Sequence, residues 1–142
     1  MESKKLPDEF VRGIANNQFI ENGVVTYQAF QFDDNPERTD SMKEASINWV
    51  DQDEAVQLAL NQKKANGELQ FRAGVAKLKM GEVKMILKSI PPEVYGFERA
   101  ALEDNPYHGN ILISNSATKP IRMMVQSGLA LAAGTNIVSL EE

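Results

Sequence analysis

The sequence contains no cysteine and only one histidine. The lack of cysteine excludes disulfides, thiolate metal ligands and cysteine nucleophiles, and it favours a reducing compartment such as the cytoplasm. With a single histidine, a zinc site would have to consist of carboxylates. The acidic pairs are better explained as solvated loop residues and a helix cap. We therefore expect a cytoplasmic protein with no metal and no cofactor.

Long apolar segments are also missing. The apolar run at 128–134 is too short to cross a bilayer, and no apolar stretch follows the lysines near the N-terminus as it would in a signal peptide. This pattern predicts no membrane partner.

The common ligand motifs are absent: there is no Walker A loop, G-x-G-x-x-G, EF-hand loop or H-E-x-x-H. The net charge of −5 is not that of a general nucleic-acid binder, so no nucleic-acid partner is expected. The one concentration of basic residues is interpreted as a solvated face; it consists of Lys77, Lys79, Lys84 and Lys88.

What is present is the composition of one ordinary globular domain over residues 1–142, with 42% apolar and 25% charged residues. Strands are expected at 24–32, 46–50, 69–79, 94–99 and 110–114, with a strand or extended tail at 136–140. Helices are expected at 51–64 and 82–88 and between Thr118 and Gly134. The order predicts an α+β fold, with a mixed or antiparallel sheet of about five strands and three helices against it.

Local signals support several of these elements. Asn22-Gly23 is a turn signal, and 33–45 is an exposed acidic loop. Asp51 is expected to cap the first helix, and Pro120 suits the first turn of the last helix. Residues 6–20 are compatible with a helix or a strand. The buried stripe of the last helix is expected to comprise Ile121, Met124, Val125, Leu129 and Ala132.

His108 is the first candidate catalytic residue, because histidine both accepts and donates protons near neutral pH. It follows Asn105-Pro106-Tyr107 and precedes an apolar strand, and Gly109 would admit a ligand or a backbone segment closely. Tyr107 and Asn110 are candidate ligand-binding residues beside it. The alternative is structural: the turn residues position a ring that hydrogen-bonds only to backbone.

Two further candidates lie earlier in the chain. Arg12 stands in an apolar setting and is a candidate anion clamp, or alternatively a surface arginine packed over apolar neighbours. Ser46 is a candidate nucleophile if a base lies beside it, although no G-x-S-x-G elbow surrounds it. Trp49 is interpreted as a core residue or a pocket wall.

Three resemblances involve these residues. Tyr107-His108-Gly109-Asn110-Ile111 resembles the His-Pro-Asn element of ubiquitin-conjugating enzymes, but that family needs a cysteine after the element, and its absence excludes conjugation. The order Arg12, Ala29-Phe30, Ser46, Asn105-Pro106-Tyr107-His108 resembles a group of small bacterial proteins, which implies no activity.

The third resemblance is to ADP-ribosyltransferases of the Arg–Ser–Glu type, through the order Arg12, Ser46, Glu54. It implies a glutamate placed against the ribose of NAD. Glu54 follows Ser46 closely, however, and also suits a helix start.

Two functions from different classes remain open. One is a non-enzymatic interaction or accessory module, such as a subunit or an antitoxin-like partner, with a protein partner or a homo-oligomer. The other is a small enzyme or ligand-binding protein for an anionic or nucleotide-like ligand. Its pocket would require Arg12 and His108 to meet in space.

Overall fold

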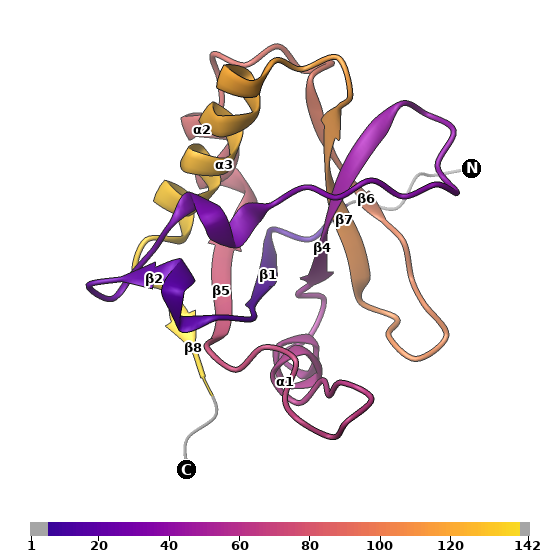
Figure 1. The fold of residues 1–142 in the computed structure, drawn as a ribbon, viewed down its shortest axis with the longest axis vertical. Coiled ribbons are helices and arrows are strands. Elements are labelled where there is room, and N and C mark those ends of the chain that lie inside the picture. Colours follow the sequence, from indigo (N-terminus) through magenta and orange to yellow (C-terminus); the bar gives the residue numbers. More distant parts are fainter. Residues whose placement is uncertain (1–5, 140–142) are drawn as a thin grey trace.

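A computed structural model describes residues 6–139 as an α+β domain (Figure 1). The strands are β1 (Glu9–Ile14), β2 (Ile20–Glu21), β3 (Val24–Val25), β4 (Met42–Trp49), β5 (Gly74–Lys79), β6 (Tyr95–Arg99), β7 (His108–Ser114) and β8 (Ile137–Val138). The α-helices are α1 (Glu54–Leu60), α2 (Met80–Ile86) and α3 (Lys119–Ala133). Two 3₁₀ helices, η1 (Asn17–Phe19) and η2 (Tyr27–Phe30), precede β4. The predicted fold class is confirmed.

One six-stranded sheet organises the domain, in the order β6-β7-β4-β1-β5-β8, and all neighbouring strands in it are antiparallel. The strands β2 and β3 form a separate small hairpin. Its turn is Asn22-Gly23, where φ is 54° and 78°. Positive φ at both central residues is the geometry that a tight hairpin turn needs, so this local prediction is confirmed.

The two faces of the sheet have different covers. On one face, which we call the helical face, α2, α3 and η2 pack over a core that includes Phe10, Phe30 and Trp49. On the other, which we call the open face, only α1 packs against the sheet, over Val11 and Val75. Figure 1 shows α2 and α3 side by side, with α1 apart from them at the lower end of the view.

The last helix follows its sequence signals closely. The Thr118 hydroxyl accepts a hydrogen bond from the Ile121 N–H, proline occupies the first turn, and Gly134 ends the helix with φ of 55°. The expected stripe is wrong at Met124, which is 50% exposed. Within the described residues no helix has the length and apolarity to span a bilayer.

Several expected boundaries are wrong. The strand expected at 24–32 stops at Val25, and Tyr27–Phe30 form η2 instead. The last four residues of the expected 33–45 loop are strand, because β4 begins at Met42. The expected strand at 69–79 is regular only from Gly74.

The other corrections concern the helices and the chain ends. The first helix spans only 54–60, and Asp51 does not cap it; its carboxylate pairs with Arg99 instead. The second helix begins two residues earlier than expected, and β7 begins at His108. The ambiguous N-terminal segment is strand β1, and Leu140 lies outside the described residues.

Candidate functional site

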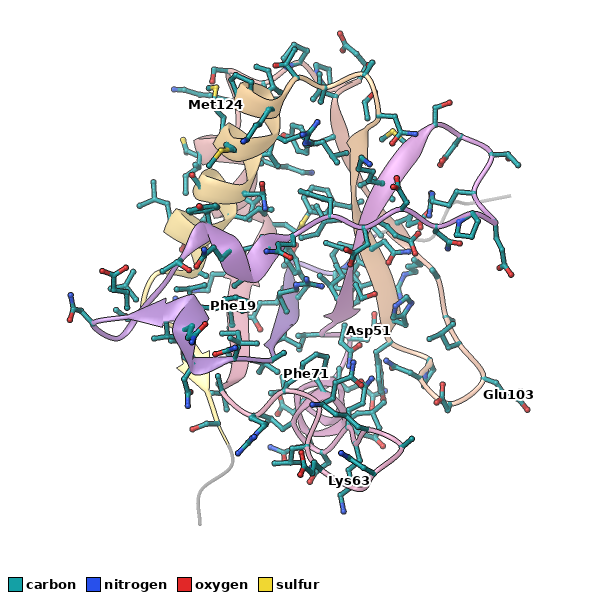
Figure 2. All side chains as sticks on the ribbon, viewed as in Figure 1. Phe19, Asp51, Lys63, Phe71, Glu103 and Met124 are labelled. Carbon is teal, nitrogen blue, oxygen red and sulfur yellow. The ribbon has the colours of Figure 1, made fainter. Side chains whose placement is uncertain are left out.

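A cavity of about 470 Å³ lies on the open face of the sheet. Ser46, Asn48 and His108 contribute from the strands β4 and β7. The other walls come from α1, from the segment after α1, and from the loop that joins β6 to β7. Figure 2 shows Lys63 and Phe71 beside α1, and Glu103 at the outer end of the β6–β7 loop. Two segments that are distant in sequence, 58–71 and 102–105, therefore converge on His108.

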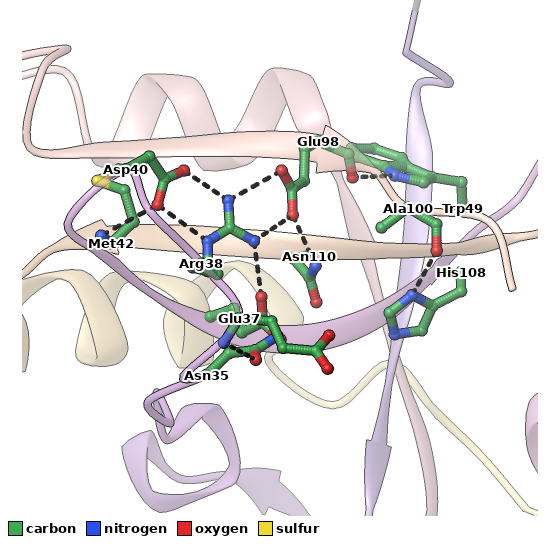
Figure 3. Close-up of polar contacts among 11 residues, drawn as sticks. Asn35, Glu37, Arg38, Asp40, Met42, Trp49, Glu98, Ala100, His108 and Asn110 are labelled. Carbon is green, nitrogen blue, oxygen red and sulfur yellow. Dashed lines mark hydrogen bonds and ion pairs between the residues drawn. The ribbon is translucent and has the colours of Figure 1, made fainter.

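His108 has a fixed ring orientation. Its Nδ1 lies 2.8 Å from the carbonyl oxygen of Ala100 (Figure 3). A carbonyl oxygen can only accept, so Nδ1 carries the proton and donates. In the neutral imidazole Nε2 is then an acceptor, and it makes no hydrogen bond to any residue in the range 6–139. The hydrogen bond to Ala100 thus leaves Nε2 as a free acceptor on a residue that lines the cavity.

Ser46 lies on the same face but does not form a nucleophile–base pair with His108. Its register partner is Asn110, whereas His108 stands opposite Asn48. Ser46 and His108 are therefore diagonal neighbours, roughly 7–8 Å apart at Cα in such a ladder. The Ser46 hydroxyl makes no hydrogen bond to the described residues. The arrangement provides a free hydroxyl in the cavity and not an activated nucleophile.

Two buried asparagines hold the cavity walls, and the sequence analysis did not single out either one. The Asn48 Nδ2 donates to the carbonyl of Ala55 in α1, and the Asn48 Oδ1 accepts from the Asn105 Nδ2 at 2.8 Å. The Asn105 Oδ1 accepts from the Tyr107 N–H. Both side chains are under 9% exposed. Since buried amides are costly when unpaired, this network fixes α1 and the β6–β7 loop relative to β4.

Tyr107 braces the outside of this wall. Its hydroxyl donates to Glu54 Oε2 at 3.0 Å, and its carbonyl accepts from the Trp49 N–H. The hydrogen bond to Glu54, with some burial and the charges of Glu54 and Asp51, raises the pKa of Tyr107. Tyr107 does not line the cavity. The side chain connects the start of α1 to the end of the β6–β7 loop.

Arg12 is directed to the helical face, away from the cavity. Its neighbour Val11 belongs to the open-face core, and side chains alternate along a strand. The Arg12 Nε donates to the carbonyl of Ala29 at 2.9 Å and Nη1 to the carbonyl of Ser46 at 2.7 Å. Burial lowers the pKa of the guanidinium, and the charge of Asp33 opposes this effect. Backbone carbonyls accept the N–H groups of the guanidinium, and Arg12 does not line the cavity.

Two expected constellations are therefore not assembled. Arg12 and His108 lie on opposite faces of the sheet, so the pocket that would combine them does not form. The Arg–Ser–Glu arrangement is not formed either, since the side chains of Arg12 and Ser46 are on different faces and Glu54 holds Tyr107.

Asn110 is covered and does not reach a ligand from the cavity. It is 3% exposed, and its Nδ2 donates to Glu98 Oε2 at 2.7 Å (Figure 3). Its Oδ1 is buried without a hydrogen-bond partner among the described residues. The side chain therefore orients Glu98 from within the sheet. Asn110 does not line the cavity.

Glu98 belongs to a charge cluster around Arg38 that the sequence analysis missed. The Arg38 Nη1 contacts Glu44 and Glu98 at 2.7 Å, and Nη2 contacts Asp40 at 2.7 Å. The hydrogen bonds to Glu98 and Asp40 raise the pKa of Arg38, and Arg38 lowers the pKa of both carboxyl groups. The cluster ties residues 34–41 to the open face of β4 and β6.

The remaining surface offers weaker candidates. Among residues 6–139, no group of histidine and acidic side chains could hold a metal ion. A wide groove of about 820 Å³ runs past Leu6, Glu9, Lys79 and Glu82, and none of the candidate catalytic or ligand-binding residues lines it. The cavity at His108 is therefore the candidate site.

Comparisons with protein-family models, with curated proteins and with solved structures give no match to this chain.

Proposed function

We propose that the protein is a non-enzymatic binding module that holds a small, uncharged polar molecule in the cavity at His108. The observation that carries the proposal is the hydrogen bond from the His108 Nδ1 to the Ala100 carbonyl. It leaves Nε2 as a preoriented acceptor at a cavity of about 470 Å³, which is within the usual size range of small-molecule sites.

The lining favours a particular ligand chemistry. Its charged side chains are Lys63 and Asp104, of opposite sign, so the cavity has no net preference for an anion. Leu58, Phe71 and Leu102 provide apolar surface. A ligand with an N–H or O–H donor for Nε2 and a flat apolar body fits this combination. Nucleobases and nucleosides are such molecules. A phosphate group on the nucleoside would not increase the affinity, because the cavity has no net positive charge.

The absence of an activated nucleophile supports binding over catalysis. A hydrolase of the serine type needs the hydroxyl within hydrogen-bond reach of the base, roughly 2.6–3.2 Å. Ser46 and His108 are diagonal neighbours with no hydrogen bond between them. Ser46 then serves as a second polar contact for the ligand.

Thermal unfolding with paired ligands tests the proposal. Nucleosides and aromatic amides should raise the melting temperature of the wild type by about 9 °C at roughly 100 times Kd, because a ligand that binds the native state stabilises it by mass action. The matching monophosphates should give no larger shift. In His108→Asn, whose shorter amide has no acceptor at the position of Nε2, the shift should be lost.

Tyr107→Phe is the matched control, since it removes a hydroxyl next to His108 but outside the cavity. It should keep the full ligand shift. Binding that survives in His108→Asn would place the ligand somewhere other than this cavity.

A protein-interaction module is the second candidate. It is favoured by Met124 and Leu131, which are 50% and 69% exposed on the outer face of α3. Large apolar side chains two turns apart on one exposed helix face are typical of contact surfaces.

A further inference from the structure

We propose that the edge strand β6 pairs with β6 of a second copy of this chain, so that the sheet continues across a twofold axis. In the described part of the chain, β6 has β7 as a neighbour on one side and no strand on the other. All five residues of β6 are half-buried, so both of its faces already pack against the domain.

The hydrogen-bond pattern shows which backbone groups point outward. The Ala100 N–H donates to His108 and the Ser114 N–H donates to Val94, so the even-numbered residues of this segment bond to β7. In an antiparallel ladder the alternate residues then direct N–H and C=O away from β7. These residues are Tyr95, Phe97 and Arg99. No described residue outside the sheet bonds to their backbone groups.

The strand carries few of the features that protect an exposed edge. Between Tyr95 and Arg99 there is no proline, no lysine and no bulge in the pairing with β7. The opposite edge of the sheet is β8, which is only two residues long. Short edge strands resist pairing, whereas a regular five-residue edge is a template for it.

One register pairs all five residues of β6 with β6 of a second copy. An axis through Phe97 places Tyr95 opposite Arg99 of the second copy and Gly96 opposite Glu98 of the second copy. Every residue whose N–H and C=O point away from β7 then pairs with another such residue, as an antiparallel ladder requires. An axis at Arg99 would instead bring like charges together across the strands, which is unfavourable. We therefore assign the free edge of β6 to a second copy of this chain.

Gly96 gives a charge-reversal test. A Cβ at this position would meet no atom within 4 Å, so Gly96→Lys and Gly96→Glu should both fold. In the dimer each new side chain stands opposite Glu98 of the other copy. Sedimentation should show a wild-type dimer. Gly96→Glu should raise the dimer dissociation constant about tenfold, because two like-charge pairs form across the axis, and Gly96→Lys should lower it.

Added salt should make the dimer dissociation constants of the two variants more similar, because the difference between these constants is electrostatic. A wild type that stays monomeric up to millimolar concentration would overturn the proposal. So would two variants that weaken the dimer equally, since this result would place the interface elsewhere. Ligand binding at His108 is measured separately, so the two proposals can fail independently.

Discussion

Replacing Gly109 with alanine is expected to lower the free energy of unfolding by about 3 kcal/mol or more, which is the upper range for overpacking a core. A Cβ at this position would overlap the indole of Trp49 and would lie 2.5 Å from the carbonyl oxygen of Glu98. Trp49 is fully buried, and its Nε1 donates to that same carbonyl at 3.0 Å. Neither group can move away without the loss of this hydrogen bond.

Gly96→Ala is the control for this prediction, because Gly96 lies on the adjacent strand with open space around its Cβ position. Urea unfolding followed by tryptophan fluorescence measures both variants, since the chain has a single tryptophan. Gly96→Ala should change stability little. An equal, small effect of the two substitutions would show that Trp49 does not pack against Gly109.

Arg38→Gln should lower the free energy of unfolding by about 2 kcal/mol at neutral pH. Removing one partner of a buried ion pair costs about 3–5 kcal/mol, and partial exposure reduces this value. The Arg38 side chain is 14% exposed, and those of Glu44 and Glu98 are 19% and 28% exposed. Without the guanidinium, the carboxylates of Glu44 on β4 and Glu98 on β6 would face each other across β7 with no cation between them.

This effect should depend on pH in a defined direction. The hydrogen bonds from Arg38, and then from Asn110, hold the pKa of Glu98 below its ordinary value in the folded protein. A lowered carboxyl pKa stabilises the fold above the unfolded pKa, and this stabilisation is lost as the pH falls through the folded pKa. The difference between wild type and Arg38→Gln should therefore be largest at neutral pH and shrink in acid.

Lys43→Gln is the comparison for Arg38. Lys43 pairs with Asp34, whose side chain is 79% exposed, so its removal should cost little at any pH. Urea unfolding at neutral and acidic pH gives both differences. An Arg38→Gln effect of unchanged size in acid would mean that the cluster does not contribute through its charges.

The sequence predicted those parts of the fold that depend on local chemistry. Asn22-Gly23 and Thr118 act through their own backbone neighbourhood, and both predictions are confirmed. The segment after Val25 was wrong because a distant contact decides it: Ala29 and Phe30 pack under α3, and Gln126 donates to the Phe30 carbonyl. Strand propensity contains no information about such a contact.

The same distinction explains the candidate site. His108 could be singled out as the only histidine, but the atom that orients it is the backbone oxygen of Ala100, which has no sequence signature. Asn48 and Asn105 meet across 57 residues. Arg12 was misinterpreted for a related reason, since its acceptors are carbonyls, and any residue type could supply them.

The most direct test of the account is the tautomer of His108, measured by long-range ¹H–¹⁵N correlation NMR on uniformly labelled protein at a pH where the ring is neutral. The chain has one histidine, so the signal needs no assignment. The account predicts a proton on Nδ1 and an unprotonated Nε2 whose shift moves when a nucleoside is added. A proton on Nε2 would contradict it, because the cavity would then contain a donor in place of the acceptor on which the proposed function rests.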